Sequence, residues 1–171
     1  MVSEEFNYSL ACNPERSVIV SACAGSGKTW LLVSRMIRLL LSGAKPHEIL
    51  AITFTRKAAQ EMKVRLETVL QEFAELPEDE LLKQLQARGM TREEALDHLA
   101  PARLLFERVL AQPRKISIDT FHGWFGRLLA GAPVSMGAQS GFALREDAKR
   151  LQEECLEDWW ASMPSDILQQ Y

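Results

Sequence analysis

The run Ala22-Cys23-Ala24-Gly25-Ser26-Gly27-Lys28-Thr29 limits what this chain can fold into more than any other segment. A short β-branched stretch, residues 17–21, precedes it, and residues 29–42, rich in helix formers, follow it. This order predicts a buried strand, a tight loop and a helix that Gly43 ends. Glycines 25 and 27 let backbone N–H groups turn inward around phosphate oxygens, toward which the helix also points its positive end. The segment therefore predicts a phosphate-binding loop, or P-loop.

Two side chains of this loop are candidates for chemistry. Lys28 supplies a positive charge for the β and γ phosphates, and the Thr29 hydroxyl is placed to ligate Mg²⁺. We therefore expect Lys28 and Thr29 to be catalytic, with Thr29 as the metal ligand. Trp30 comes next to the nucleotide, although packing in the core is an equal alternative for this side chain. The expected nucleotide-binding residues are Ala22, Cys23, Ala24, Gly25, Ser26, Gly27, Lys28, Thr29 and Trp30.

Two further strand and helix pairs follow along the chain. Residues 49–53 read as a buried strand, and Thr55 is placed to cap a helix with one apolar face. Residues 115–119 read as a third strand, which leads into a helix over 120–129. Strands that alternate with helices in this way predict a parallel sheet.

The remaining segments are helical in pattern. Residues 77–112 contain prolines, Gly89 and a Thr91-x-x-Glu94 capping box, and they predict two or three short helices inserted into the α/β pattern. Residues 145–160 form another amphipathic pattern. We therefore expect residues 1–144 to form one domain with a helical insertion, and residues 145–171 to begin a second, helical subdomain.

Charge and composition restrict where a partner can bind. The net charge of −3 gives no global basic field, so any nucleic-acid site must be local. Arg56, Lys57, Lys63 and Arg65 form a basic cluster, for which a solvated helix face is the equal alternative. No apolar run approaches the roughly 18 residues of a membrane span, and the first residues lack a secretion signal. We therefore expect a cytoplasmic protein without a membrane partner, whose three cysteines are reduced and buried.

Three motifs, in this order, resemble those of superfamily 1 DNA helicases of the UvrD, RecB and AddA group. The P-loop begins with alanine, as is common in that group. The run Thr53-Phe54-Thr55-Arg56-Lys57-Ala58-Ala59-Gln60-Glu61-Met62 is similar to motif Ia, and Asp119-Thr120-Phe121-His122 is similar to motif Ic. Together they span residues 14–129. The leader Asn13-Pro14-Glu15-Arg16-Ser17 and the Leu-rich helix ending at Gly43 look most like AddA-type subunits of helicase-nucleases.

The resemblance implies a RecA-like α/β fold with a parallel sheet, of which this chain holds the N-terminal part. It implies ATP and Mg²⁺ as cofactors and single-stranded DNA as the substrate. It also implies a second helicase-nuclease subunit as a partner in DNA repair, with exonuclease activity in the assembly. The residues expected to contact DNA are Thr53, Phe54, Thr55, Arg56, Thr120, Phe121 and His122. Without the resemblance, Phe54 reads more readily as core, Thr120 as a helix cap and His122 as a local hydrogen-bonding residue.

Two features of the family pattern are missing. Tyr8 stands near the position of a glutamine that reads adenine, so adenine selectivity is less secure than phosphate binding. The Asp-Glu pair that holds Mg²⁺ and activates water in the family is also missing. We therefore expect the chain to be a piece of a longer protein and to be inactive alone. We expect its sheet to lack central strands, and the chain to self-associate or to rearrange its strand order as a result. The alternatives are a small kinase or GTPase with Asp119 as its Mg²⁺ partner, and a binding module that does not hydrolyse nucleotide.

Overall fold

The computed structural model describes residues 8–21, 23, 25–131, 153 and 155–157. The chain divides into two compact units, Met1–Gly126 and Arg127–Tyr171. The expected subdomain over 145–171 lies almost wholly outside the described residues; residues 153 and 155–157 are helical. The described helices, in chain order, are α1 (Tyr8–Cys12), α2 (Lys28–Leu41), the 3₁₀ turn η1 (Pro46–Glu48), α3 (Arg56–Glu75), α4 (Glu78–Ala87), α5 (Arg92–Asp97), α6 (Leu99–Arg103), α7 (Leu105–Ala111) and α8 (Phe121–Ala130).

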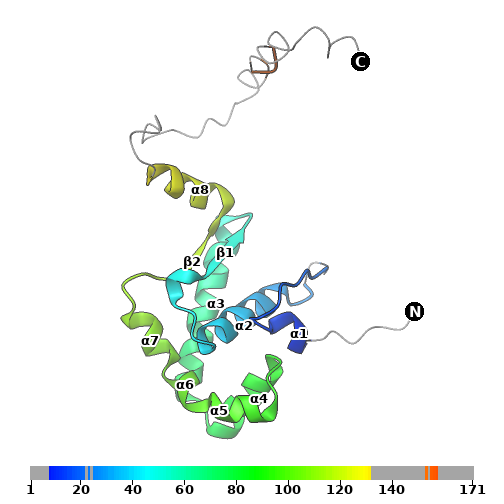
Figure 1. Cartoon of the computed structure of the whole chain (residues 1–171), viewed down its shortest axis with the longest axis vertical. Helices are drawn as coiled ribbons and strands as arrows, with labels where there is room; N and C mark the ends of the chain where they lie inside the picture. Colours follow the sequence, from blue (N-terminus) through cyan, green and yellow to red (C-terminus); the bar gives the residue numbers. More distant parts are fainter. Residues whose placement is uncertain (1–7, 22, 24, 132–152, 154, 158–171) are drawn as a thin grey trace, which may run out of the picture. The chain divides into compact units, whose positions relative to one another are not determined.

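Two strands form a parallel sheet in the described part of the chain. β1 (Leu50–Thr53) pairs with β2 (Ser117–Thr120), in a register that places Leu50 beside Ser117 and Thr53 beside Thr120. Figure 1 shows the two strands side by side. The predicted parallel pairing of these two segments is therefore confirmed. The rest of an expected RecA-like sheet is not seen among the described residues.

The strand predicted over residues 17–21 is wrong for this structure. These residues carry no strand assignment, and the Ile19 side chain is fully exposed. β-branched residues favour an extended backbone, but a strand also needs a neighbour that exchanges main-chain hydrogen bonds with it. Among the described residues, β1 and β2 pair with each other and neither pairs with this segment.

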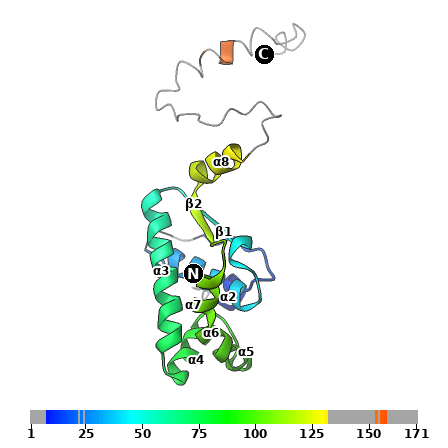
Figure 2. The same cartoon turned by 90° about the vertical axis from the view of Figure 1, so that its left-hand side faces the viewer.

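The long helix α3 organises the core. Thr55 caps it, because its hydroxyl oxygen accepts a hydrogen bond from the Ala58 amide at 3.1 Å. Its buried face has the predicted helical spacing and consists of Ala59, Met62, Leu66, Leu70 and Phe73. In Figure 2 the strands lie near the N-terminal end of α3, and α4 to α6 lie near its C-terminal end. One helix therefore joins the sheet to the helical segment that follows.

Residues 78–111 form four short helices, α4 to α7, rather than two or three. The predicted capping box is present at α5, where Thr91 and Glu94 each bind the other's main-chain amide, at 3.2 and 2.8 Å. Leu81, Leu85 and Leu105 of these helices are fully buried in the same core as α2 and α3. The helical segment is thus part of the main core.

One face of β1 has no cover within the described residues. Leu50 and Ile52, which alternate along the strand and so share a face, are both more than 40% exposed. Parallel sheets are ordinarily covered on both faces. This face is an apolar surface on an otherwise packed unit. None of the described helices is long and apolar enough to cross a membrane.

Candidate functional site

The glycine-rich loop leads directly into α2. Gly25 and Gly27 both have left-handed backbone conformations, with φ of 80° and 81°, which are costly for residues with a Cβ atom. A Cβ atom built on either glycine would meet no other atom within 4 Å, so the space in front of the loop is open. Ala22 and Ala24, also expected to bind nucleotide, lie outside the described residues.

Hydrogen bonds within the loop hold its turn. The main-chain amide and the hydroxyl of Ser26 both donate to the carbonyl oxygen of Cys23, at 3.3 and 2.7 Å, and the Lys28 ammonium donates to the same oxygen. The ammonium of Lys28 therefore lies over the loop. Gly27 is the N-cap of α2 and offers no side-chain acceptor to the first turn. Amides of a helix's first turn have no acceptor within the helix, so this end of α2 suits an anion.

A pocket of about 430 Å³ lies beside the loop. Its lining includes Ser26, Gly27 and Lys28 from the loop, Trp30 from α2 and Tyr8 from α1. The Tyr8 and Trp30 rings meet edge to face, with centroids 5.4 Å apart and planes at 86°. The pocket thus combines a cation, a helix N-terminus and an aromatic wall. These residues fit a nucleotide, because the loop suits the phosphates and the rings suit the base. The Thr29 hydroxyl, which suits Mg²⁺, lines the adjoining groove with Trp30.

Arg35 fixes the chain that leads into the loop. Its guanidinium donates to the main-chain oxygens of Ala11 and Asn13, at 3.2 and 2.7 Å, and to that of Arg16. These bonds tie the segment between α1 and the loop to α2. The sequence interpretation missed this role, although a charged residue within the largely apolar second half of α2 is a visible signal.

The sheet brings the two other motifs together. Because Thr53 pairs with Thr120, β1 and β2 end at the same edge. Phe54 and Thr55 follow one strand, and Phe121 and His122 follow the other, and all four side chains are exposed. Ligands of open parallel sheets bind outside the carboxyl ends of the strands, which is where these residues lie.

The polar residues of this edge differ in what they contact. The Thr53 hydroxyl donates to the carbonyl of Thr55 at 3.0 Å, and Arg56 is exposed at the start of α3. Thr120 is buried, and its hydroxyl oxygen accepts from the Gly123 amide at 3.1 Å, as a helix cap does. Thr120 therefore supports the turn into α8, whereas Phe121 and His122 face solvent.

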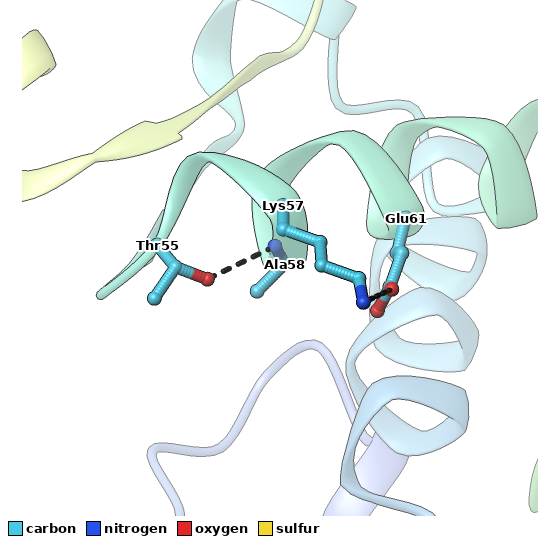
Figure 3. A network of polar contacts seen from close by, with 4 residues as sticks. All are labelled: Thr55, Lys57, Ala58 and Glu61. Carbon is cyan, nitrogen blue, oxygen red and sulfur yellow. Dashed lines mark hydrogen bonds and ion pairs between the residues drawn. The ribbon is translucent and has the colours of Figure 1, made fainter.

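The basic cluster at the start of α3 does not form one patch. Lys57 pairs with Glu61 one turn along the helix, at 3.9 Å, and both are exposed (Figure 3). Lys57 and Arg65 line a groove of about 910 Å³ that also contains Thr29, Trp30 and Arg88. Lys63 instead lines an apolar pocket between α3, α7 and β2. The predicted cluster is thus divided between two sides of α3.

Asp119 is the residue that a small kinase or GTPase would use as its Mg²⁺ partner. It sits in β2 opposite Ile52, and one carboxylate oxygen accepts from the Thr120 amide at 2.7 Å. The groove that contains Thr29 and the pocket that contains Lys28 and Trp30 do not include Asp119 in their linings. The arrangement gives no support to the alternative of Asp119 as a Mg²⁺ partner.

The expectation of three buried cysteines is wrong for two of them. Cys12 is buried between α1 and α2, and burial raises the pKa of its thiol. Cys23, in the P-loop, and Cys155 are exposed. Of the three, Cys12 alone belongs to a core cluster of the described residues, where it packs with Ala11 and Leu31. All three described cysteines are free thiols.

Comparison with known proteins gives matches of two kinds. The family model described as the UvrD/REP helicase N-terminal domain matches residues 3–170. Among curated proteins, an ATP-dependent helicase/nuclease subunit from Lactobacillus acidophilus is 51% identical over 53 residues, 31% of this chain and 4% of that protein. Proteins with the same name from Levilactobacillus brevis and Streptococcus sanguinis are 43% and 45% identical over 77 and 75 residues, each 44% of this chain and 6% of theirs. The matched segments are thus a small part of those relatives.

Proposed function

The chain belongs to the UvrD/REP helicase N-terminal domain family, and from this premise we propose that it is the ATP- and single-stranded-DNA-binding part of a DNA helicase. Relatives of the chain are named as subunits of an ATP-dependent helicase/nuclease. We propose that the longer protein is one of two subunits of a repair helicase-nuclease with exonuclease activity, which works in the cytoplasm. We propose residues 1–144 as the first part of the ATPase domain, with 77–112 as its helical insertion, and 145–171 as the start of a helical subdomain.

The P-loop geometry carries the nucleotide half of this proposal. Two left-handed glycines, the ammonium of Lys28 over the loop and the N-terminus of α2 favour bound phosphates. The Thr29 hydroxyl would hold Mg²⁺, which would neutralise charge on the phosphates. The ring of Trp30 would lie against the base, with Tyr8 beside it. These residues bind and orient the nucleotide.

The shared edge of β1 and β2 carries the DNA half. Every base has a flat face that stacks on an aromatic ring, so exposed Phe54 and Phe121 suit single-stranded DNA without sequence preference. Thr53, Thr55, Arg56 and His122 would contact phosphates. Thr120 would act by holding the turn. We propose that, in the family's helicases, ATP binding and hydrolysis close two such ATPase domains and thereby move a DNA strand that is bound at this edge.

Alkylation of Cys23 tests nucleotide binding with an internal control. We expect N-ethylmaleimide to modify exposed Cys23 and Cys155 quickly and buried Cys12 slowly, because burial raises the pKa of the Cys12 thiol. MgATP at about ten times its Kd should slow Cys23 modification roughly tenfold, since only unbound protein reacts. Mass spectrometry of the labelled peptides measures each rate. An unchanged Cys23 rate, or equal slowing at Cys155, would contradict the proposed site.

Phe54→Ala tests the DNA edge. We expect it to weaken binding of single-stranded oligo-dT by about 1–3 kcal/mol, the contribution of one stacked base. The melting temperature should stay nearly constant, because the ring is fully exposed. Fluorescence anisotropy gives the affinity. Leu104→Ala, at an exposed apolar position between α6 and α7, is the matched control and should change neither quantity. Equal weakening by both variants would contradict a specific DNA contact.

The uncovered face of β1 supports the expectation that the chain self-associates. We expect the mass from light scattering to rise with concentration, because Leu50 and Ile52 present apolar surface to solvent. Ile52→Lys should shift the equilibrium toward monomer, since it places a charge on this face. A strict monomer at high concentration for the unaltered chain would show that the face is not a contact.

A further inference from the structure

The turn that ends α4 contacts the elements on both sides of the P-loop. Gly89 lies so close to α1 that a Cβ atom there would come within 2.5 Å of the Ser9 Cα atom and 2.7 Å of the Tyr8 carbonyl oxygen. The Gly89 carbonyl accepts a hydrogen bond from Arg38 of α2 at 2.9 Å. This turn therefore supports both α1, which carries Tyr8, and α2, which carries Trp30.

Arg88, in the same turn, lies between two aromatic rings. Its guanidinium carbon is 5.6 Å from the centroid of Trp30 and 4.9 Å from that of Phe73 in α3. One nitrogen donates to the carbonyl and side-chain oxygens of Gln84, at 2.6 and 2.7 Å. The side chain thus links the core helix α3 to the tryptophan beside the P-loop.

Arg88 is an unusual residue to find in this place. It is only 3% exposed, its Nε atom has no hydrogen-bond partner, and neither ion pair in the described part of the chain includes it. Burial lowers its pKa to about 10, so it remains charged at neutral pH. The Glu72 carboxylate in the same groove favours the charged form, but it makes no ion pair with Arg88 in the described part of the chain. A buried cation without such a pair costs folding free energy that an apolar side chain would not. Stability alone therefore does not account for an arginine here.

Trp30 gives this arginine a connection to the nucleotide. The Trp30 side chain lines the pocket that contains Tyr8, Ser26, Gly27 and Lys28, and it also lines the groove that contains Arg88 and Gln84. Its ring therefore stands between the P-loop pocket and the buried guanidinium. Movement of Arg88 would change the position of the ring in the pocket.

We propose that Arg88 is a positioning residue for the base of the nucleotide, which it places by holding the ring of Trp30 while Gly89 holds Tyr8. This inference rests on the proposed ATP site and adds to it a part for the helical segment 77–112. The phosphates bind at the loop, and the base packs against the aromatic wall that the end of α4 supports. Arg88 itself does not touch the nucleotide.

Calorimetry on the full chain with two ligands tests this role. Mg·ATP has a base, and Mg·tripolyphosphate has phosphates alone. In the unaltered chain, ATP should bind several-fold more tightly than tripolyphosphate. Arg88→Met should weaken ATP roughly fivefold, the order of one cation–π contact, and leave tripolyphosphate unchanged. Arg88→Lys keeps the charge without the flat guanidinium, so its ATP affinity should lie between those of the unaltered chain and Arg88→Met.

A double-mutant cycle separates positioning from a general loss of structure. In a Trp30→Ala background, Arg88→Met should have no further effect on ATP affinity, because the ring through which it acts is gone. The melting temperature of Arg88→Met should stay close to that of the unaltered chain, because the cost of the buried charge is removed. If that variant does not fold, Gln84→Ala, at an exposed position, loosens Arg88 and should weaken ATP alone, by a smaller factor.

The outcomes distinguish this inference from the proposed function. Failure of the unaltered, folded chain to bind either ligand would overturn the ATP site. Binding of both ligands with equal affinity by the unaltered chain would overturn the aromatic wall. Three results would overturn the positioning role and leave the ATP site standing. The first is that Arg88→Met or Gln84→Ala weakens the binding of both ligands equally. The others are an unchanged ATP affinity in these variants and an effect of Arg88→Met that adds to that of Trp30→Ala.

Discussion

Lys28→Ala should weaken Mg·ATP binding by about 3 kcal/mol, or roughly 100-fold, because it removes a charge-assisted contact to the phosphates. The fold should not change, since the Lys28 side chain is exposed and its ammonium donates to a carbonyl oxygen of the same loop. Single-stranded DNA affinity should also be preserved, because the DNA edge follows β1 and β2 instead. In a longer helicase that contains this segment, ATPase activity and unwinding should fall by orders of magnitude.

Equilibrium dialysis with labelled ATP, together with oligo-dT anisotropy on the same preparations, measures both affinities. Lys83→Ala is the control, because Lys83 is another exposed lysine and is paired with Glu80 on α4, outside the loop. It should leave ATP affinity nearly unchanged. Equal loss of ATP and DNA binding in Lys28→Ala would identify a structural lysine and contradict the assigned role.

Gly89→Ala should lower the free energy of unfolding by about 2–5 kcal/mol. Its φ of 81° is unfavourable for alanine by about 1–2 kcal/mol. The added methyl group would also meet the main chain of Ser9 at 2.5 Å, and overpacking of this kind costs about 1–3 kcal/mol more. Because the obstacle is backbone, relief requires α1 to move away from the turn.

Urea denaturation followed by circular dichroism measures this loss. Gly43→Ala is a matched control, because Gly43 has a similar φ of 99° and nothing within 4 Å of an added Cβ atom. It should show the backbone cost alone, about 1–2 kcal/mol. If the two variants lose the same stability, the close approach of α1 to the end of α4 is not present in solution.

Local signals in the sequence identified most of the described elements. The P-loop glycines, the Leu-rich α2 and the Thr55 cap depend on residues near one another in the chain, and each lies close to its predicted position. The pairing of β1 with β2 also followed, because a strand, helix and strand in series favour a parallel pair. These features needed no knowledge of distant contacts.

The strand over residues 17–21 shows where local reasoning fails. Val18, Ile19 and Val20 have the composition of a buried strand, yet burial and pairing depend on a neighbouring segment rather than on these residues. Residues 78–111 form more helices than predicted, because their boundaries also depend on how the helices pack and not on local sequence alone. The chain bends at His98 and Leu104, which cap adjoining helices. Pro101 lies close to the first bend, but residues 102–106, around the second, include no proline or glycine.

The candidate site was predictable in its parts and not in its arrangement. The loop and the two motifs were evident from residue types, but the register that places Thr53 beside Thr120 exists only in the folded sheet. Arg88 gave no signal, since an arginine at the end of a polar helix ordinarily faces solvent. Its burial between Trp30 and Phe73 depends on residues 58 and 15 positions away along the chain.

Calorimetric titration of Mg·ATP into the purified chain tests the central claim most directly, because every proposed role depends on a nucleotide at this P-loop. We expect one Mg·ATP bound per chain, in a folded protein whose circular dichroism shows the helices described above. Lys28→Ala should abolish the measurable heat at the same concentrations. No binding by the folded, unaltered chain, or binding that Lys28→Ala leaves intact, would contradict the account.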